Sequence, residues 1–489
     1  MARSGHASPN LQAYLRERSF VGGRWIAASG GGTIAVRNPA TGEVLGSVPD
    51  CGREEAAQAV AAAKAAFPGW KARTAKDRAA VLRRLADIVE GAVEPLAVLL
   101  TSEQGKSLKE ARGEVGASAA YIRWFAEEAQ RVYGDVVPSP WSDRRILVTR
   151  EPLGVVGAIT PWNFPSSMIA RKLAPALAAG CTIVIKPSEM TPFSGLAWGV
   201  LAEEAGLPPG VVNIVTGSPV EIGAELAGNT DVAKITFTGS TRVGRILVEQ
   251  SARTLKRVSM ELGGNAPFIV FDDADLDRAV EGAMAAKFRN SGQTCVCANR
   301  FIVQSGIHDR FVNRLVAAVK GLKVGDGLDD GTEQGPLINP QAVDKVRGHI
   351  ADAVARGAVV ATGGRSHALG GTFFEPTVLT GVTRGVAISQ EETFGPLAPV
   401  FRFDTDEEAV TLANDTEYGL AAYFFTRDLA RAFRVAEALR CGMVGVNEGL
   451  ITTEVAPFGG VKQSGLGREG SRYGMDDYLD LKYVCMGGL

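Results

Sequence analysis

The feature that most constrains the fold is an alternation of short apolar runs with helical patterns in the middle of the chain. The predicted strands are residues 154–160, 181–185, 211–215 and 232–237, and the helices that follow them are residues 166–179, 192–205, 220–226 and 241–253. Because a helix separates each strand from the next, neighbouring strands must run parallel with right-handed crossovers between them. The pattern therefore predicts a doubly wound α/β sheet.

Further structure is predicted on both sides of this sheet. Residues 54–131 carry apolar side chains at three- and four-residue spacing, which is typical of helices. A second region of alternating strands and helices spans residues 268–401, with helices at 275–289 and 309–319. Two α/β units in tandem commonly enclose a cleft that binds a ligand.

Two segments lie outside these units and look extended. Residues 133–150 contain Pro138 and Pro140 and then a strand-like run at 145–149, and residues 476–485 near the C-terminus are also strand-like. Because exposed strands of this kind often pair across subunits, we expect an oligomer.

Composition excludes several classes of protein. The 489 residues, 46% of them hydrophobic and 22% charged, are typical of a globular chain of about three domains. A net charge of −2 gives no basic surface for nucleic acid, and no apolar run approaches the ~18 residues of a membrane span. Six scattered cysteines indicate reduced thiols and a cytoplasmic protein. The first residues lack the apolar core of a signal peptide, and we expect a disordered start.

Polar segments follow the predicted strands at residues 160–165, 186–189, 216–217 and 237–241. Ligands of open α/β sheets bind beyond the carboxyl ends of the strands, near helix N-termini. Gly239 and Gly244 have the spacing that aims backbone N–H groups at a phosphate, although an ordinary strand–turn–helix corner has it too. Lys186 and Glu189 can bind ribose hydroxyls there, or they are solvated loop residues.

The nucleophile is expected on the polar turn at residues 288–297. We predict no metal site, because the four histidines are scattered and no cysteine pair has partners at ligand spacing. A thiolate is the most nucleophilic side chain near neutral pH, so Cys295 is a candidate and Cys297 a weaker one. The alternative is that both are small buried hydrophobes. Glu261, before two glycines, is either a surface residue or a base that activates water.

Seven segments taken together resemble the aldehyde dehydrogenase superfamily, in the right order and over almost the whole chain from about residue 34. They are residues 160–165, 186–189, 237–241, 261–264, 292–295, 391–396 and 457–460. Residues 288–300 and 461–473 look most like the succinate-semialdehyde dehydrogenase branch.

The resemblance implies a fold of three parts. These are a Rossmann-type NAD(P)-binding domain (residues 1–132 and 152–262), a second α/β catalytic domain (263–445) and a small β oligomerisation element (133–151 and 470–489). It also implies a homodimer or homotetramer.

The resemblance assigns Cys295 as nucleophile, Glu261 as general base, the Asn163 amide as oxyanion donor, and Lys172 with Glu469 as a proton relay. The cofactor is NAD or NADP, and its expected contacts are Trp162, Lys186, Ser188, Glu189, Gly239, Ser240, Gly244, Leu262, Glu392 and Phe394. Glu189 favours NAD because it repels a 2′-phosphate, whereas Ser188 and Lys186 can accommodate NADP.

The expected substrate is an aldehyde with a carboxylate at its far end. Arg171 and Arg289 match positions where relatives that oxidise apolar aldehydes have apolar groups, and arginine binds carboxylate in bidentate fashion. Thr452, Phe164 and Phe458 complete the expected pocket. The alternative is that both arginines form structural ion pairs.

The predicted reaction is oxidation of succinate semialdehyde to succinate through a Cys295 thiohemiacetal and thioester. Glutarate semialdehyde is the alternative, because one methylene changes binding by only about 1–3 kcal/mol. A thiol esterase or coenzyme A acyltransferase, and a non-catalytic binding protein, are the alternatives of other classes. A disulfide between Cys295 and Cys297 is a further hypothesis, for a redox switch.

Overall fold

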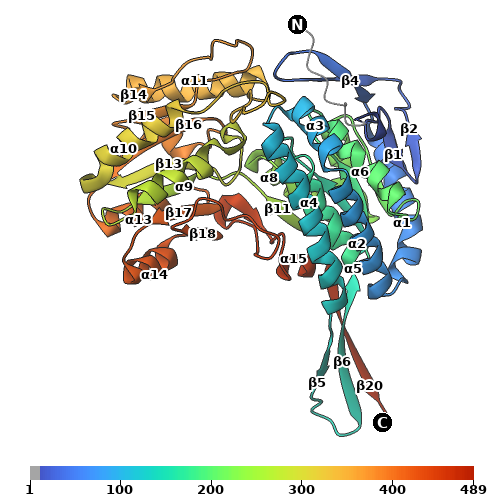
Figure 1. Cartoon of the computed structure of the whole chain (residues 1–489). Coiled ribbons are helices and arrows are strands. Elements are labelled where there is room, and N and C mark those ends of the chain that lie inside the picture. Colours follow the sequence, from blue (N-terminus) through green and yellow to red (C-terminus); the bar gives the residue numbers. More distant parts are fainter. Residues whose placement is uncertain (1–10) are drawn as a thin grey trace.

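The computed structural model describes residues 11–489 and consists of two α/β units side by side with a narrow arm that projects from the first (Figure 1). Residues 1–10, where most of the expected disordered start lies, are outside the described part. None of the helices in residues 11–489 combines the length and the apolar content that crossing a membrane requires.

The first unit is built on an eight-stranded sheet of order β19-β11-β10-β7-β8-β9-β1-β2. Its strands are β1 (Ser19–Val21), β2 (Arg24–Ile26), β7 (Val155–Ile159), β8 (Thr182–Lys186), β9 (Val212–Ile214), β10 (Val232–Thr238), β11 (Arg257–Glu261) and β19 (Gly465–Leu466). In the part of the sheet formed by β7 to β11, every pair of neighbouring strands is parallel. The chain winds from β7 through β8 to β9 and then restarts on the other side of β7 with β10 and β11. The expected doubly wound sheet is confirmed, and its ligand crevice lies beyond β7 and β10.

Helices cover both faces of this sheet. They are α1 (Arg53–Lys71), α2 (Ala75–Gly91), α3 (Val93–Gln104), α4 (Leu108–Glu128), α5 (Ser167–Ala179), α6 (Pro192–Glu204), α7 (Pro219–Gly228) and α8 (Thr241–Ala252). α2 to α6 share one hydrophobic core, and α1, α7 and α8 share another. Every residue of α5 is buried, so polar groups on this helix face protein rather than water.

The second unit is a seven-stranded sheet of order β14-β15-β16-β13-β12-β17-β18. Its strands are β12 (Ala266–Val270), β13 (Ala298–Gln304), β14 (Val359–Thr362), β15 (Thr377–Thr380), β16 (Leu397–Phe403), β17 (Ala421–Phe425) and β18 (Met443–Val446). Its helices are α9 (Leu276–Phe288), α10 (Ser305–Lys320), α11 (Pro340–Ala355), α12 (Ala387–Gln390), α13 (Asp406–Asn414) and α14 (Leu429–Ala438). α10 starts before the predicted residue 309. No side chain caps its N-terminus, so the sequence carries no capping signal at the true start.

After β18 the chain returns to the first unit. β19 pairs with the end of β11, and α15 (Tyr473–Asp476) follows. Met475 and Tyr478 are buried in the core around α5, so the start of the segment 470–489 belongs to the packing of the first unit. Near the N-terminus, β3 (Thr33–Arg37) and β4 (Val44–Pro49) form a separate hairpin.

The arm is a three-stranded antiparallel sheet of order β20-β6-β5. It joins β5 (Asp135–Val137) and β6 (Arg144–Pro152) to the C-terminal strand β20 (Leu479–Gly487), and Figure 1 shows it standing clear of the helices. The two extended segments expected from the sequence therefore pair with each other.

Candidate active site

Cys295 lies on a tight turn between α9 and β13. Asn290 and Ser291 have φ of 51° and 56°, a left-handed conformation that is rare for residues with side chains. Gly292 follows with φ of 74°, and a Cβ there would lie 2.2 Å from the carbonyl oxygen of Gly395. This turn leaves Cys295 partly exposed, whereas Cys297 is buried.

The two thiols differ in their surroundings. The Cys297 thiol donates to the carbonyl oxygen of Lys287 at 3.4 Å. Burial and the nearby Glu392 carboxylate raise the pKa of Cys295 to about 12, and the Arg171 guanidinium acts in the opposite direction. A thiol with this pKa is protonated near neutral pH, so attack by Cys295 requires added positive charge or a base.

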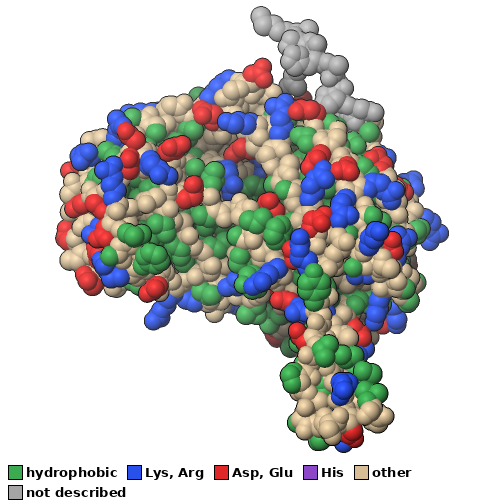
Figure 2. All heavy atoms as spheres, turned by 60° about the horizontal axis from the view of Figure 1, so that its bottom comes forward, with side chains coloured by type: hydrophobic (Ala, Val, Ile, Leu, Met, Phe, Trp, Pro, Cys, Tyr) green, Lys and Arg blue, Asp and Glu red, His purple; other side chains and the backbone are tan. Residues whose placement is uncertain are grey.

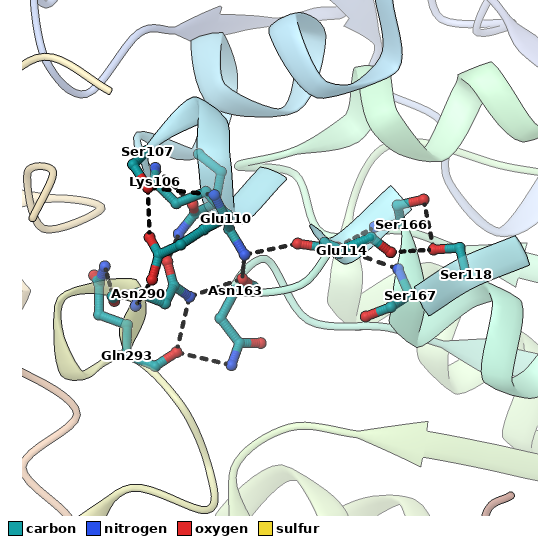
Figure 3. A network of polar contacts seen from close by, with 11 residues as sticks. Lys106, Ser107, Glu110, Glu114, Ser118, Asn163, Ser166, Ser167, Asn290 and Gln293 are labelled. Carbon is teal, nitrogen blue, oxygen red and sulfur yellow. Dashed lines mark hydrogen bonds and ion pairs between the residues drawn. The ribbon is translucent and has the colours of Figure 1, made fainter. Parts of the chain in front are cut away.

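Asn163 follows β7 and reaches across to the Cys295 turn (Figure 3). Its Nδ2 donates to the carbonyl oxygen of Gln293 at 3.0 Å, which joins loops from the two α/β units. A side-chain amide has two N–H groups. One is taken by Gln293, so the second can serve an oxygen atom next to Cys295.

Glu261 is the last residue of β11 and is 3% exposed. Within residues 11–489, neither of its carboxylate oxygens has a hydrogen-bond partner. Burial, and then the negative charge of Glu469, raise its pKa well above the usual value, while Lys172 and Arg171 act to lower it. Lys172 pairs with Glu469 and donates to Thr238 Oγ1 at 2.7 Å. Glu261 therefore holds a proton in an enclosed site beside a charged pair.

The predicted cofactor residues of the first unit lie at the carboxyl ends of its parallel strands or at the start of α8. Lys186 Nζ lies 2.7 Å from Glu189 Oε2, where β8 ends. Ser240 caps α8 by accepting from the N–H of Val243 at 3.4 Å, and Gly239 donates its N–H to the carbonyl oxygen of Glu261 at 3.0 Å.

α8 starts close to the end of β11. A Cβ on Gly244 would lie 2.5 Å from Leu262 Cδ2, so only glycine allows this approach. Backbone N–H groups at the start of this twelve-residue helix attract an anion, which fits the pyrophosphate of a dinucleotide.

The second half of the crevice lies nearer to Cys295. The Trp162 and Phe394 rings meet edge to face at 5.5 Å, and Phe394 has φ of 56°. Glu392 Oε1 accepts from the N–H of Gly264 at 3.1 Å, and burial raises the pKa of this carboxyl to about 7. The Ser188 hydroxyl, like that of Ser240, accepts from a backbone N–H, that of Met190 at 3.2 Å. An acidic side chain and aromatic rings suit a ribose and a nicotinamide ring.

Arg171, on α5, is 5% exposed and lies between two aromatic rings. Its guanidinium carbon is 4.9 Å from the centre of the Tyr121 ring and 4.5 Å from that of Phe458. Nε and Nη1 have no hydrogen-bond partner in the part of the chain that the structure describes. The alternative of a structural ion pair is therefore not supported for Arg171, because a buried cation without a partner is unfavourable.

The other predicted substrate residues lie in two neighbouring groups. Arg289 and Thr452 line one pocket together with Thr294, Cys297 and Tyr423. The Arg289 guanidinium also lies 5.5 Å from the centre of the Phe164 ring. Phe164 directly follows Asn163, so this ring links the predicted substrate residue Arg289 to the loop that carries the predicted oxyanion donor.

Sequence reasoning missed four residues beside the site: Lys106, Glu114, Tyr121 and Asn290. All four are buried in the structure. Lys106 and Glu114 come from a helical region where charged residues are usually exposed, and no sequence signal marks them as an interior pair. Within residues 11–489, no group of three or more potential metal ligands comes together.

The site places the Cys295 thiol near the buried Glu261 carboxylate, beside a helix start that can bind a phosphate. A family model described as "Aldehyde dehydrogenase family" matches residues 25–484. The chain belongs to the aldehyde dehydrogenase family and is an NAD(P)-dependent oxidoreductase.

Individual relatives are similar over nearly the full length. The glutarate-semialdehyde dehydrogenase of Pseudomonas aeruginosa is 59% identical over 97% of this chain and 98% of that protein. The succinate-semialdehyde dehydrogenase (NADP(+)) of Escherichia coli is 57% identical over 97% and 98%. The crystal structure of succinate-semialdehyde dehydrogenase from Burkholderia pseudomallei superposes with a TM-score of 0.97 at 59% identity, covering 99% of this chain and all of that one. The expected fold class is confirmed.

Proposed function

We propose that this chain oxidises succinate semialdehyde to succinate with NAD or NADP. The observation that carries the choice of substrate is Arg171, a buried guanidinium with unpartnered nitrogens close enough to Cys295 to affect its pKa. A carboxylate at the far end of the aldehyde would pair with it. Glutarate semialdehyde is the second candidate, because a relative of 59% identity carries that name.

The reaction starts at Cys295. The thiol first loses its proton to solvent, and the thiolate then attacks the aldehyde carbon and forms a thiohemiacetal whose oxygen carries negative charge. The free N–H of Asn163 and the backbone N–H of Cys295 stabilise that oxygen, and one such donor is worth about 3 kcal/mol in the transition state. The bound nicotinamide supplies the acceptor for the hydride that leaves this carbon.

Glu261 is the base for hydrolysis of the resulting thioester. Once Glu261 has lost the proton that its raised pKa favours, its carboxylate, which has no partner within residues 11–489, takes a proton from water, and the resulting hydroxide attacks the acyl carbon. The Lys172–Glu469 pair lies close enough to shift the pKa of Glu261, so it supports transfer of this proton away from the site. The carboxylic acid then leaves Cys295.

Substrate contacts are proposed for Arg171, Arg289, Thr452, Phe164 and Phe458. Arg171 is packed against Phe458, and Arg289 lies with Thr452 in one pocket and over Phe164. Both cations can donate hydrogen bonds to a carboxylate. This arrangement supports binding of an aldehyde that carries one negative charge.

Cofactor binding is proposed for the crevice residues Trp162, Lys186, Ser188, Glu189, Gly239, Ser240, Gly244, Leu262, Glu392 and Phe394. The Lys186–Glu189 pair bears on the choice of nucleotide. Glu189 accepts from a ribose diol and repels a 2′-phosphate, unless Lys186 leaves Glu189 to neutralise that phosphate. Both NAD and NADP stay in the proposal as candidate cofactors, since a relative of 57% identity is named for NADP(+).

We also propose a cytoplasmic homodimer or homotetramer. The six cysteines are free, and the projecting arm offers strand edges to a second copy. The domain division proposed from the sequence, with 1–132 and 152–262 binding nucleotide and 263–445 forming the catalytic unit, is consistent with two separate sheets. The oligomerisation element then comprises 133–151 and the β20 part of 470–489.

The test measures NAD(P)H formation with succinate semialdehyde, glutarate semialdehyde and hexanal, each with NAD and with NADP. The two semialdehydes are expected to be the better substrates. Arg171→Ala should lower kcat/KM for them by about 10- to 100-fold, the worth of a charged hydrogen bond, with little effect on hexanal. Equal losses on all three substrates would show that Arg171 is structural.

Cys295→Ala is the chemical control. It should abolish oxidation while nucleotide binding, followed by fluorescence, persists. Wild-type protein that hydrolyses a thioester but forms no NAD(P)H from any of the three aldehydes would instead identify a thiol esterase.

A further inference from the structure

A buried ion pair lies directly behind the Asn163 loop. Lys106 Nζ is 2.6 Å from Glu114 Oε2, and the two side chains are 0% and 1% exposed. Lys106 sits between two helices, because Gly105 ends α3 with φ of 95° and Ser107 caps α4 by accepting from the N–H of Glu110. Interior ion pairs are stable only when hydrogen bonds satisfy their remaining donors and acceptors.

The Lys106 ammonium makes two hydrogen bonds and lies against one aromatic ring. Besides Glu114, Nζ donates to the main-chain oxygen of Asn163 at 2.7 Å, and it lies 3.8 Å from the centre of the Phe164 ring. Both residues are proposed to contact substrate. Lys106 therefore holds the backbone of one and the ring of the other without lying in the pocket itself.

Glu114 connects Lys106 to the start of α5. Its Oε1 accepts from the N–H groups of Ser166 and Ser167, at 2.9 and 3.2 Å, at the start of α5 (Figure 3). This is the helix that carries Arg171 and Lys172. The pair thus fixes the whole link between β7 and α5.

Asn290 holds the same carbonyl from the second unit. Its Nδ2 donates to the Asn163 oxygen at 2.9 Å and to the Gln293 oxygen at 3.2 Å, while Asn163 Nδ2 donates to that same Gln293 oxygen. Asn290 is itself held by Gln104, whose Nε2 donates to Oδ1 at 3.0 Å. Figure 3 shows Lys106 and Asn290 both directed at Asn163.

We propose that Lys106, held by Glu114, is a positioning residue that sets the Asn163 amide against Cys295 for the oxyanion. This inference rests on the proposed function, in which Asn163 is the oxyanion donor. Its effect belongs to the transition state, so losing Lys106 slows hydride transfer rather than weakening binding. A misplacement of about 1 Å at such a donor can lower a rate about 10²-fold.

The main test is the double variant Lys106→Met/Glu114→Gln, which removes both charges at similar volume. The hydride-transfer rate constant, measured in a single turnover with succinate semialdehyde, should fall about 10²-fold. Nucleotide affinity and KM should stay close to the wild-type values. In an Asn163→Ala background the same double change should have little further effect, because the lost donor is the one that Lys106 positions.

Two further variants separate positioning from general stability. Lys234→Met removes a buried lysine that donates to Ser259 elsewhere in the first unit, and it should leave the hydride-transfer constant unchanged. Glu114→Gln keeps Lys106 and an acceptor oxygen, so it should fold even if the double variant does not. A smaller drop in the same constant is expected for it.

The inference is overturned if hydride transfer keeps its wild-type rate in the double variant, or in Glu114→Gln where only that variant folds. It is equally overturned if the losses add fully to that of Asn163→Ala, or if Lys234→Met causes the same kinetic loss. Wild-type protein that oxidises neither semialdehyde would instead refute the proposed function.

Discussion

At the residue scale, the site is marked by charged side chains that lack partners. Glu261 has two unpartnered oxygens and Arg171 two unpartnered nitrogens among the described residues, although both are buried. The Lys106–Glu114 pair, equally buried, has hydrogen-bond partners on both sides. Since buried charged groups nearly always have partners, we propose that water acts at Glu261 and an anionic substrate at Arg171.

The raised pKa of Glu261 gives a prediction about pH. A carboxyl with a raised pKa is still protonated above its usual 4.5, and only its deprotonated form accepts a proton from water. Deacylation should therefore speed up as pH rises through that pKa. Glu261→Gln should slow deacylation by about 10²- to 10⁴-fold and remove this pH dependence. The measurement is a burst of NAD(P)H followed by slow turnover, with the acyl-enzyme detected by mass.

Glu103 provides the matched control for this titration. It is a buried carboxyl that accepts from the N–H groups of Phe193 and Ser194 at the start of α6, and burial raises its pKa to about 8. The folded state therefore keeps this proton between pH 4.5 and about 8 while the unfolded state loses it, so stability falls as pH rises across that window. Glu103→Gln should flatten this fall in Tm and leave the pH profile of turnover intact.

A Glu261→Gln enzyme with wild-type turnover would contradict the role of Glu261 as the base.

At the element scale, the start of α8 depends on its close approach to β11. Gly244→Ala would place a methyl group 2.5 Å from Leu262 Cδ2, so the Leu262 side chain or the first turn of α8 must shift. Overpacking of this kind costs about 1–3 kcal/mol. Because this turn is where we propose the pyrophosphate binds, the dissociation constant for NAD(P) should rise in a fluorescence titration.

Gly223→Ala is the matched change on α7. A Cβ there would lie 3.8 Å from Leu247 Cδ2, an ordinary contact, so the helix need not move. Alanine should stabilise the protein by about 0.4–1 kcal/mol, raise Tm slightly and leave nucleotide affinity unchanged. If both variants weaken nucleotide binding equally, the close approach of α8 to β11 is not what matters.

At the scale of the whole molecule, the local pattern determines much of the fold but little of the site. Alternating strands and helices predicted β7 to β10 with bounds within about one residue, because that periodicity is local. The Lys172–Glu469 pair joins residues 297 apart, and the rings around Arg171 come from α4 and the C-terminal region. No local pattern carries such contacts, so the roles of these residues came from family resemblance.

The arm is a second case in which local patterns do not predict contacts between segments distant in the sequence. Two of its three strands, β6 and β20, were predicted, whereas β5 was not, and the pairing of β20 with β6 emerges only in three dimensions. Leu481 and Tyr483 on β20 are 69% and 61% exposed, and Figure 2 shows hydrophobic side chains on the surface of the arm. Small sheets without a covering layer are marginally stable, and their edges pair readily with another chain. These properties support the proposal that a second copy covers the arm.

The double variant Leu481→Glu/Tyr483→Glu tests this proposal. Residue 481 lies opposite Arg150 on β6, so a carboxylate there is compatible with the folded arm but unfavourable against an apolar partner. The wild-type mass by light scattering should be that of a dimer or tetramer, and the double variant should shift to a smaller species with its Tm little changed. Leu255→Glu, at a residue 93% exposed near the end of α8, controls for the loss of an exposed leucine and should keep the wild-type mass. A wild-type monomer, or an arm variant with unchanged mass, would exclude the arm as the interface, because burial of these two side chains is what a partner contributes.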